Sequence, residues 1–317
     1  MSEIHFEHKP VLFKETIESL NIDPEGTYID GTAGGGGHSG AILQRLTTGT
    51  LLSIDRDPDA IAVVKERLGK YPGSVVAMGN FCDMDKIALE HGIVNVDGVL
   101  LDIGVSSYQL DTAERGFSYH ADAPLDMRMS QSGTSAADLV NTLSWQELAE
   151  IISRYGEDKS AVRIAKGIVK AREEKPIETT LELAEIIRES VPAAVRRAEG
   201  HPARRTFQAL RIAVNGELDA LKKGLTAAFG LLKSGGRLSV ITFHSLEDRI
   251  VKRFFEKRLH PDRDLDPRLP MPAGFNAQPW FCDVIRILPT KSEAESNPRA
   301  RSSVLRVGTR TARLWED

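Results

Sequence analysis

The stretch Tyr28-Ile29-Asp30-Gly31-Thr32-Ala33-Gly34-Gly35-Gly36-Gly37-His38-Ser39-Gly40 places a short apolar strand directly before a glycine-rich turn. Ala41 to Leu46 continues after the turn as a helix. Glycines in such a turn let a ligand approach the backbone without interference from Cβ atoms. A strand, a glycine-rich loop and a helix in this order are typical of the first unit of an open α/β sheet.

Three further apolar segments follow along the chain, at Leu51–Asp55, Val75–Met78 and Gly98–Asp102. They are nearly all apolar, as strands covered by helices on both faces of a parallel sheet must be. The residues of Pro58–Leu68 show apolar spacings of three and four, which predicts a helix between two of these strands. The sequence therefore predicts a doubly wound α/β sheet.

The pattern changes after about Ser107, and residues 107–205 contain no convincing strand. Helical runs occupy most of this region, at Ser144–Tyr155, Lys159–Glu174 and Thr180–Val191. From Thr206 an apolar helical stripe continues to Leu232, and it predicts one long helix. Strand-like segments then follow at Arg237–Phe243, Trp280–Leu288 and Ser303–Thr309. We predict one α/β domain, residues 1–106 and 206–317, interrupted by a helical insertion over residues 107–205.

Composition excludes several classes of protein. The chain has 317 residues, of which 41% are hydrophobic and 27% charged, as in a globular protein. No apolar run approaches the roughly 18 residues that span a bilayer, and the first residues lack the pattern of a signal peptide. Neither Cys82 nor Cys282 belongs to a C-x-x-C pair, and the eight histidines are scattered. We expect a cytoplasmic protein without a membrane-spanning segment, a disulfide framework or a metal site.

Basic residues concentrate in three windows although the net charge is −4. Arg196–Arg211 carries five arginines and one glutamate, Arg249–Arg258 five basic residues and one glutamate, and Arg299–Arg313 five arginines and no acid. Such segregation suits a polyanion held in one place. Solvated helix faces are the alternative interpretation of each window.

The glycine loop fits two cofactor motifs. Gly35, Gly37 and Gly40 spell G-x-G-x-x-G, the dinucleotide fingerprint. The alternative reading, acid-x-T-x-G-x-G from Asp30 to Gly36, is close to the loop of S-adenosylmethionine-dependent methyltransferases. A tight strand-to-helix turn without a ligand is the third interpretation, so the loop alone decides nothing.

The ends of the other strands favour adenosylmethionine. Asp55 ends the second strand, where a carboxylate can accept hydrogen bonds from ribose hydroxyls of either cofactor. Phe81 follows the third strand, where an adenine could stack on its ring. Asp102 ends the fourth strand. Suitable groups at four consecutive strand ends are improbable by chance.

Motifs along nearly the whole chain resemble those of the bacterial 16S rRNA cytosine-N(4)-methyltransferases, the RsmH (or MraW) family. The matching segments are His8–Leu12, Tyr28–Thr32, Gly36–Ser39, Ile54–Asp57, Leu101–Ser107, Gln109–Asp111, Arg115–Ser118, Pro124–Met129, Thr206–Ile212, Phe243–Arg249 and Asn297–Ser303. The segments Leu101–Ser107 and Phe243–Arg249 are the most specific of them. Two residues depart from the pattern: Tyr108 replaces a proline, and Arg204 replaces a threonine.

The resemblance implies a class I (Rossmann-like) methyltransferase domain with an inserted helical domain. It implies methylation of the exocyclic 4-amino group of a cytidine in the decoding region of 16S rRNA, with the small ribosomal subunit as the expected partner. The oligomeric state stays open, a homodimer included. Cofactor contacts would fall at Gly36, Gly37, His38, Asp55, Phe81, Asp102 and Gln109.

The chemical roles follow from what a cytosine amine needs. Its lone pair is delocalised into the ring, so an acceptor on the amine hydrogens and a base for the released proton would help. Asp102 is the first candidate and His244 the second, although His244 could equally order the turn in which it lies. Phosphates would be held by arginines, namely Arg196, Arg197, Arg204, Arg205, Arg211, Arg299 and Arg301. A non-catalytic RNA-binding assembly factor and an NAD-type oxidoreductase remain as alternatives.

Overall fold

The computed structural model describes residues 10–197, 200–262 and 277–313, so His8 and Lys9 of the first family motif lie outside the described residues. The chain forms two compact units: Met1–Gly104 with Leu218–Asp317, and Val105–Glu217. We call them the sheet unit and the helical unit. The second boundary of the helical unit lies beyond the predicted residue 205 because the helix Arg204–Asn215 contributes Phe207 and Leu210 to the core of that unit.

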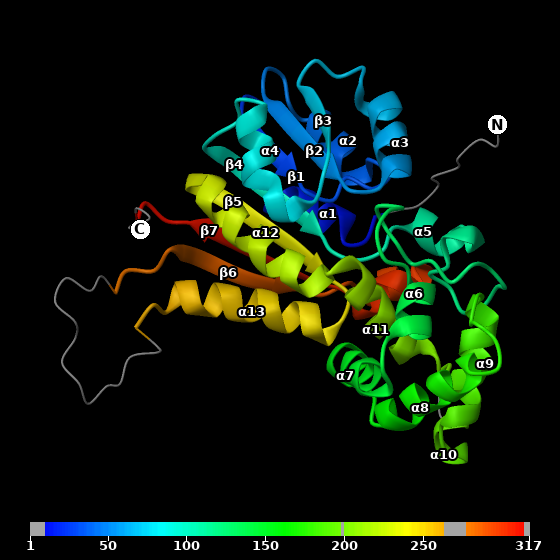
Figure 1. Ribbon diagram of the computed structural model, residues 1–317. Helices are drawn as coiled ribbons and strands as arrows, with labels where there is room; N and C mark the ends of the chain where they lie inside the picture. Colours follow the sequence, from blue (N-terminus) through cyan, green and yellow to red (C-terminus); the bar gives the residue numbers. More distant parts are fainter. Residues whose placement is uncertain (1–9, 198–199, 263–276, 314–317) are drawn as a thin grey trace. The chain divides into compact units, whose positions relative to one another are not determined.

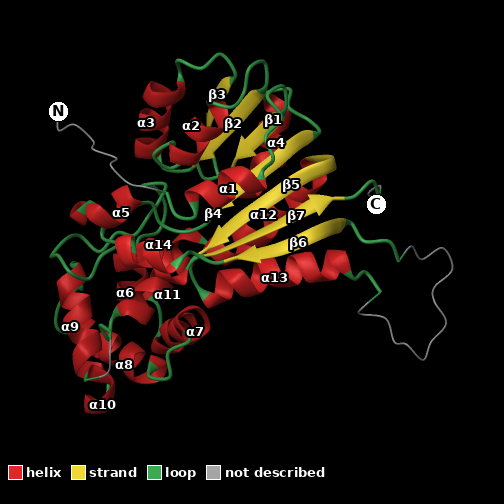
Figure 2. Ribbon diagram, turned by 180° about the vertical axis from the view of Figure 1, so that it is seen from behind, coloured by secondary structure: helices red, strands yellow, loops and turns green. Residues whose placement is uncertain are grey.

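The sheet unit is built on seven strands in the order β3-β2-β1-β4-β5-β7-β6. Their bounds are β1 Thr27–Asp30, β2 Thr50–Asp55, β3 Ser74–Met78, β4 Val96–Asp102, β5 Leu232–Thr242, β6 Phe281–Ile287 and β7 Val304–Arg310. Strands β1 to β5 are parallel, whereas β7 runs antiparallel to both β5 and β6 (Figures 1 and 2). The predicted doubly wound α/β sheet is thereby confirmed.

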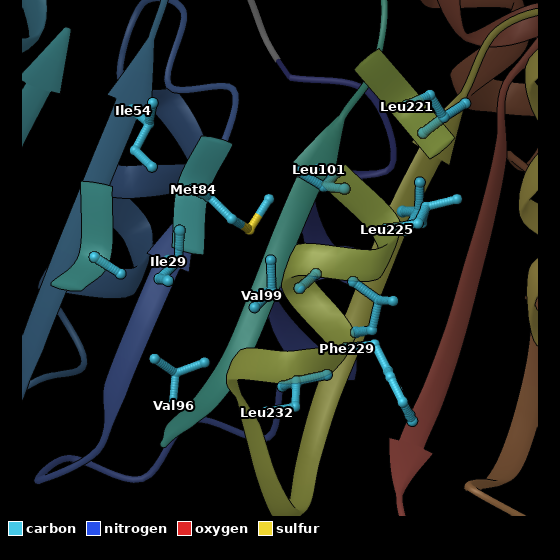
Figure 3. Packing of buried hydrophobic residues seen from close by; sticks show 14 of the residues in the cluster. Ile29, Ile54, Met84, Val96, Val99, Leu101, Leu221, Leu225, Phe229 and Leu232 are labelled. Atoms are coloured by element: carbon cyan, nitrogen blue, oxygen red, sulfur yellow. The ribbon is translucent and has the colours of Figure 1, made fainter. Parts of the chain in front are cut away.

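Helices cover both faces of this sheet, which explains why the central strands β1, β2 and β4 are largely buried. The helical segments of the unit are α1 Phe13–Ser19, α2 Gly37–Leu43, α3 Pro58–Leu68, η1 Phe81–Asp83, α4 Met84–Glu90, α12 Glu217–Leu231, α13 Ser245–Leu259, α14 Lys291–Ser296 and η3 Pro298–Ser302. Alternate strand residues enter different cores: Val99 packs in one cluster with Phe229 of α12, whereas Leu100 packs in another with Ile42 of α2. Figure 3 shows the first of these clusters.

The predicted long helix from Thr206 to Leu232 is in fact two helices. The first, α11 (Arg204–Asn215), ends at Gly216, which has φ +61° and donates its N–H to the carbonyl of Ile212. Glycine adopts this left-handed conformation without strain and therefore ends the helix. Because α12 continues the same apolar spacing, the hydrophobic pattern alone did not reveal the break.

The helical unit contains α5 Ser107–Asp111, η2 Ala113–Arg115, α6 Ala136–Thr142, α7 Trp145–Gly156, α8 Ala161–Arg172, α9 Thr180–Ser190, α10 Ala193–Arg196 and α11. Ser135, Ser144 and Thr179 start three of these helices with capping boxes, in which a carboxylate three residues on accepts from the cap backbone. Within the described part of this unit, extended pairing is limited to the bridge between Pro124 and Thr179. No described helix combines the length and apolarity that a membrane span requires.

Candidate functional site

The candidate site lies where the strand order of the sheet unit reverses. Strand β1 pairs with β2 on one side and with β4 on the other, which makes the carboxyl end of β1 a topological switch point. Asp30, Asp55 and Asp102 are the last residues of β1, β2 and β4, so three carboxyl groups end at this edge.

Asp30 fastens the glycine loop to the helix that follows it. Its side chain is 1% exposed and accepts hydrogen bonds from the Thr32 N–H (3.1 Å) and the Ser39 hydroxyl (2.6 Å). Burial raises the pKa of Asp30, and these hydrogen bonds work against that rise. Because Thr32 begins the loop and Ser39 lies in α2, the carboxyl group holds the loop at both ends.

The backbone of the loop distinguishes the two cofactor motifs. Gly34 (φ +50°) and Gly36 (φ +80°) adopt the left-handed conformation, whereas Gly35, Gly37 and Gly40 do not. The two loop glycines with a left-handed backbone are thus those of the acid-x-T-x-G-x-G reading. A Cβ on Gly37 would lie 2.6 Å from Cγ of Pro10, so this predicted contact residue is closely covered by another part of the chain.

Asp55 holds the loop from the neighbouring strand. Its Oδ2 accepts from the Gly34 N–H at 2.7 Å, and its Oδ1 accepts from the Asp57 N–H at 2.9 Å. Burial nevertheless raises the pKa of Asp55 to about 6. An acceptor at this strand end can also take hydrogen bonds from a ligand that carries hydroxyl groups.

Asp102 and His38 leave polar atoms unsatisfied beside the loop. Oδ1 of Asp102 and Nε2 of His38 are buried and have no hydrogen-bond partner within the described structure. Oδ2 of Asp102 lies 3.6 Å from Nδ1 of His38, whose ring stacks on Phe13. Buried polar atoms of native proteins are normally hydrogen-bonded, so these two mark a place for a polar ligand.

Burial sets the protonation of this pair. It lowers the pKa of His38 to about 4, so the imidazole is neutral at pH 7. It raises the pKa of Asp102 to about 8, and the carboxylates of Asp30 and Glu247 add to the rise. The two groups therefore form a neutral contact at pH 7, with the proton on Asp102.

His244 occupies the N-cap of α13, directly after β5. Its Nδ1 accepts from the Glu247 N–H at 3.5 Å, and its Nε2 lies 3.0 Å from Oε1 of Glu247. The interpretation that His244 orders its turn has these contacts in its favour. A role of His244 in proton transfer stays a prediction.

Glu247 is a residue that sequence reasoning missed. It is fully buried, and its Oε2 accepts from the N–H groups of Phe243 (2.8 Å) and His244 (3.3 Å). Its spacing of three from the cap residue is the sequence signal of a capping box and could have identified it. Through this contact Glu247 fixes the turn that follows β5.

We expect Glu247→Ala to lower the free energy of unfolding by about 3 kcal/mol, because two buried N–H groups lose their acceptor. Glu247→Gln keeps one acceptor oxygen, and we expect it to cost less. Urea denaturation measures both, with Glu256→Ala as a control on the same helix. Equal midpoints for Glu247→Ala and Glu256→Ala would contradict this assignment.

Two predicted cofactor contacts, the aromatic Phe81 and the amide Gln109, lie in different units. Phe81 begins η1 after β3, and a Cβ on Gly224 of α12 would come within 2.4 Å of its ring. Gln109 lies in the helical unit, where its Oε1 accepts from the Ser106 N–H at 3.0 Å. The structure therefore brings together the loop glycines, His38, Asp55 and Asp102, with Phe81 packed on α12.

The candidate arginines differ in how far they are already engaged. Arg196, Arg197 and Arg204 are exposed on the helical unit, and Arg205 is exposed with Nη1 donating to the Glu157 carbonyl at 2.9 Å. Arg211 instead forms a two-pronged ion pair with Glu217, with both N···O distances 2.8 Å. In the sheet unit, Arg301 is exposed and Arg299 is half-buried in η3.

We expect Arg211→Ala to destabilise the protein by about 3 kcal/mol, because it leaves the buried carboxylate of Glu217 without its partner. Arg204→Ala removes an exposed arginine of the same helix, and its effect should stay within about 0.5 kcal/mol. Chemical denaturation of the two variants tests the difference. If both unfold alike, Arg211 is no structural ion pair.

Comparison with known proteins gives one consistent result. Residues 5–311 match the MraW methylase family. A protein of Lachnospira eligens is 52% identical over 96% of this chain and 98% of its own, and one of Deinococcus radiodurans is 52% identical over 97% and 91%. Both are named ribosomal RNA small subunit methyltransferase H. Among solved structures, a putative rRNA methylase of Clostridium thermocellum aligns over 96% of this chain and 100% of its own, with 13% identity and a TM-score of 0.45.

Proposed function

The chain belongs to the MraW methylase family, and on that premise we propose that it is an S-adenosylmethionine-dependent methyltransferase of 16S ribosomal RNA. The target we propose is the exocyclic 4-amino group of a cytidine in the decoding region. The proposal chiefly rests on Oδ1 of Asp102, which has no partner among the described residues and lies beside a loop whose left-handed glycines follow the methyltransferase motif.

The residues at the switch point fit this cofactor, which supplies a methyl group on a positively charged sulfur. Gly34 leaves room for a ligand, since a Cβ on it would meet only the Thr32 carbonyl, at 3.9 Å. Asp55 offers acceptor oxygens to ribose hydroxyls, and Asp102 ends β4 at the same edge of the sheet, with Asp30 of β1 between them. Such a set of acids suits a cationic ligand with hydroxyl groups, and family membership leaves the oxidoreductase alternative without support.

Asp102 is placed to assist the amine of the target base. Once Asp102 is ionised, its Oδ1 can accept a hydrogen bond from the amine and can hold the proton that the amine releases. At pH 7 the carboxyl group must first lose the proton that it carries, and the positive sulfur of a bound cofactor would favour that loss. A carboxyl group with a pKa raised to about 8 is a much stronger base than an ordinary one when it is ionised. The neutral ring of His38 lies beside this carboxyl group, with Nδ1 3.6 Å from Oδ2.

The test of the proposal is radiolabelled methyl transfer to unmodified small subunits and to naked 16S rRNA, followed by mapping of the labelled nucleoside. We expect label in N4-methylcytidine, with more of it from subunits than from naked rRNA. Absence of transfer to both substrates would instead favour a non-catalytic assembly factor. A homodimer and a cytoplasmic location stay predictions.

We expect neutralising Arg299 and Arg301 together to weaken RNA binding and leave cofactor binding unchanged. The slope of log K against log salt concentration is negative, and each lost phosphate contact reduces its magnitude by about 0.7 for single strands. The loss of two contacts should therefore make the slope shallower by about 1.4. Filter binding over a salt series measures it, and Lys70→Gln, another exposed cation of the sheet unit, is the control. An unchanged slope would mean that these arginines make no contact with RNA phosphates.

A further inference from the structure

A cluster of arginines lies at the edge of the sheet opposite to the site described above. Arg258 is in the last turn of α13, Arg310 ends β7, and Arg313 follows it. The end of α13, the start of β6 and the end of β7 lie side by side in Figures 1 and 2. In the register of the sheet, Val304 pairs with Thr242 at the carboxyl end of β5, whereas Thr309 pairs with Arg237, so Arg310 is remote from the carboxyl strand ends.

The three guanidinium groups stack on aromatic rings. Cζ of Arg258 lies 3.8 Å from the ring centroid of Phe254 and 4.7 Å from that of Phe229. Cζ of Arg310 lies 4.3 Å from the same Phe229 ring. Stacking on rings attracts cations, but it neutralises neither charge. Two groups of like charge are therefore held on one buried phenyl ring.

Arg313 and Trp280 extend the cluster. Cζ of Arg313 lies 3.5 Å from the Trp280 ring centroid, and Nη1 of Arg310 donates to the Trp280 carbonyl at 3.3 Å. The main chain of Trp280 also donates its N–H to the carbonyl of Arg258 at 2.9 Å. These contacts make one continuous assembly of arginines and aromatic rings.

Several donors of this assembly are buried without an acceptor. They are Nε of Arg258, Nε of Arg310 and Nε1 of Trp280. Arg310 is only 7% exposed. No ion pair joins any of the three arginines to a carboxylate within the described ranges, whereas the similarly buried Arg211 and Arg306 are paired with Glu217 and Asp248.

Burial and mutual repulsion make the positive charges of the cluster unfavourable. Burial, together with the charge of Arg310, lowers the pKa of Arg258 to about 10. Burial, together with the charge of Arg313, lowers the pKa of Arg310. A buried cation is costly unless an anion compensates it. Among the residues that the structure describes, no anion compensates the cluster.

We propose that Arg258, Arg310 and Arg313 form an anion site that takes a phosphate group, with Trp280 Nε1 as an additional donor. The planar fork of a guanidinium matches two phosphate oxygens, and three guanidinium groups belong to this assembly. Arg258 and Arg313 are only partly buried, so an anion can reach the cluster from solvent. The phosphate could belong to an RNA backbone or be free, and the site does not depend on the proposed methyl transfer.

The first test is thermal unfolding in inorganic phosphate against chloride of equal ionic strength. At ten times the dissociation constant we expect phosphate to raise the Tm of the wild type by about 3 °C. The rise should vanish in Arg258→Met/Arg310→Met and persist in Arg253→Met, an exposed arginine of the same helix. No rise in the wild type, or an equal rise in the double variant, would overturn the proposal.

A second measurement keeps the arginines intact. In a Trp145→Phe/Trp315→Phe variant, Trp280 is the only tryptophan, so its fluorescence reports on the cluster. We expect inorganic phosphate to change its emission in a saturable way, and emission unaffected by phosphate would overturn the site. A short oligoribonucleotide identifies an RNA backbone as the ligand if it saturates the emission change at a lower concentration of phosphate groups than inorganic phosphate does. A response to inorganic phosphate alone identifies free phosphate. Because neither test measures methyl transfer, failure of the anion site leaves the proposed function untouched.

Discussion

Exchanging Asp102 for Asn is expected to slow methyl transfer by about 10²- to 10⁴-fold, the usual contribution of a positioned acid or base. The amide has the size of the carboxyl group but can neither take up a proton nor gather negative charge near the amine. Single-turnover transfer to small subunits measures the loss, and calorimetry with adenosylmethionine shows whether binding survives. Turnover and affinity both at wild-type level would remove Asp102 from the mechanism.

The same variant has a second, independent readout in the pH dependence of stability. Because the pKa of Asp102 is raised from 3.8 to about 8 in the folded protein, the folded state binds the proton more tightly than the unfolded state. This contribution to stability is complete below about pH 4 and is lost as the pH rises towards 8. A rise of this size corresponds to about 6 kcal/mol at most, and the 24% exposure of the Asp102 side chain lowers the expected contribution to about 3–5 kcal/mol.

Urea denaturation between pH 4 and 8.5 therefore separates the variants. The wild type should lose stability with rising pH, whereas Asp102→Asn should lose about 3–5 kcal/mol less over the same range. Asp85→Asn, which alters an exposed acid of the same unit, should follow the wild type. Parallel curves for wild type and Asp102→Asn would show that Asp102 titrates normally.

Much of the sheet unit could be predicted because a strand that is buried on both faces appears in the sequence as a short run of apolar residues. The apolar segments ending in Asp55 and Asp102 are β2 and β4, and the acids at their ends meet at one edge of the sheet. The antiparallel direction of β7 could not be predicted in this way, since an apolar strand has the same composition in either direction. The break at Gly216 was hidden for a similar reason.

The site was predictable in residue type but not in contacts. The sequence of the glycine loop allowed two readings. The neighbouring strand ends favoured the methyltransferase reading, and the left-handed backbone of Gly34 and Gly36 adds a structural reason for it. The sequence predicted Arg211 as one of several phosphate-binding arginines, whereas the structure pairs it with Glu217. A charge pattern shows where cations are concentrated, but only the fold shows which of them already have a partner.

Exchanging Asp55 for Asn is expected to weaken adenosylmethionine binding by about 100-fold. Both oxygens of Asp55 accept main-chain hydrogen bonds, from Gly34 and from Asp57, and an amide can serve only one of them. A hydrogen bond to a charged group contributes about 1.5–3 kcal/mol, which corresponds to one to two decades of affinity. Isothermal calorimetry measures the loss directly.

The matched control is Asp57→Asn, the same chemical change two residues further along. Asp57 caps α3 by accepting from the Asp59 N–H, and asparagine caps a helix equally well. Equal dissociation constants for the two variants would mean that Asp55 has no special part in the site.

The pH dependence of binding distinguishes a direct role of Asp55 from support of the loop alone. Since burial raises the pKa of Asp55 to about 6, the carboxylate that accepts from ribose hydroxyls forms as the pH rises through that value. The affinity of the wild type should therefore increase between pH 5 and 7 and then level off, whereas that of Asp55→Asn should stay flat. A wild-type affinity that does not change over this range would assign the ribose hydroxyls to another acceptor and leave Asp55 only its hold on Gly34.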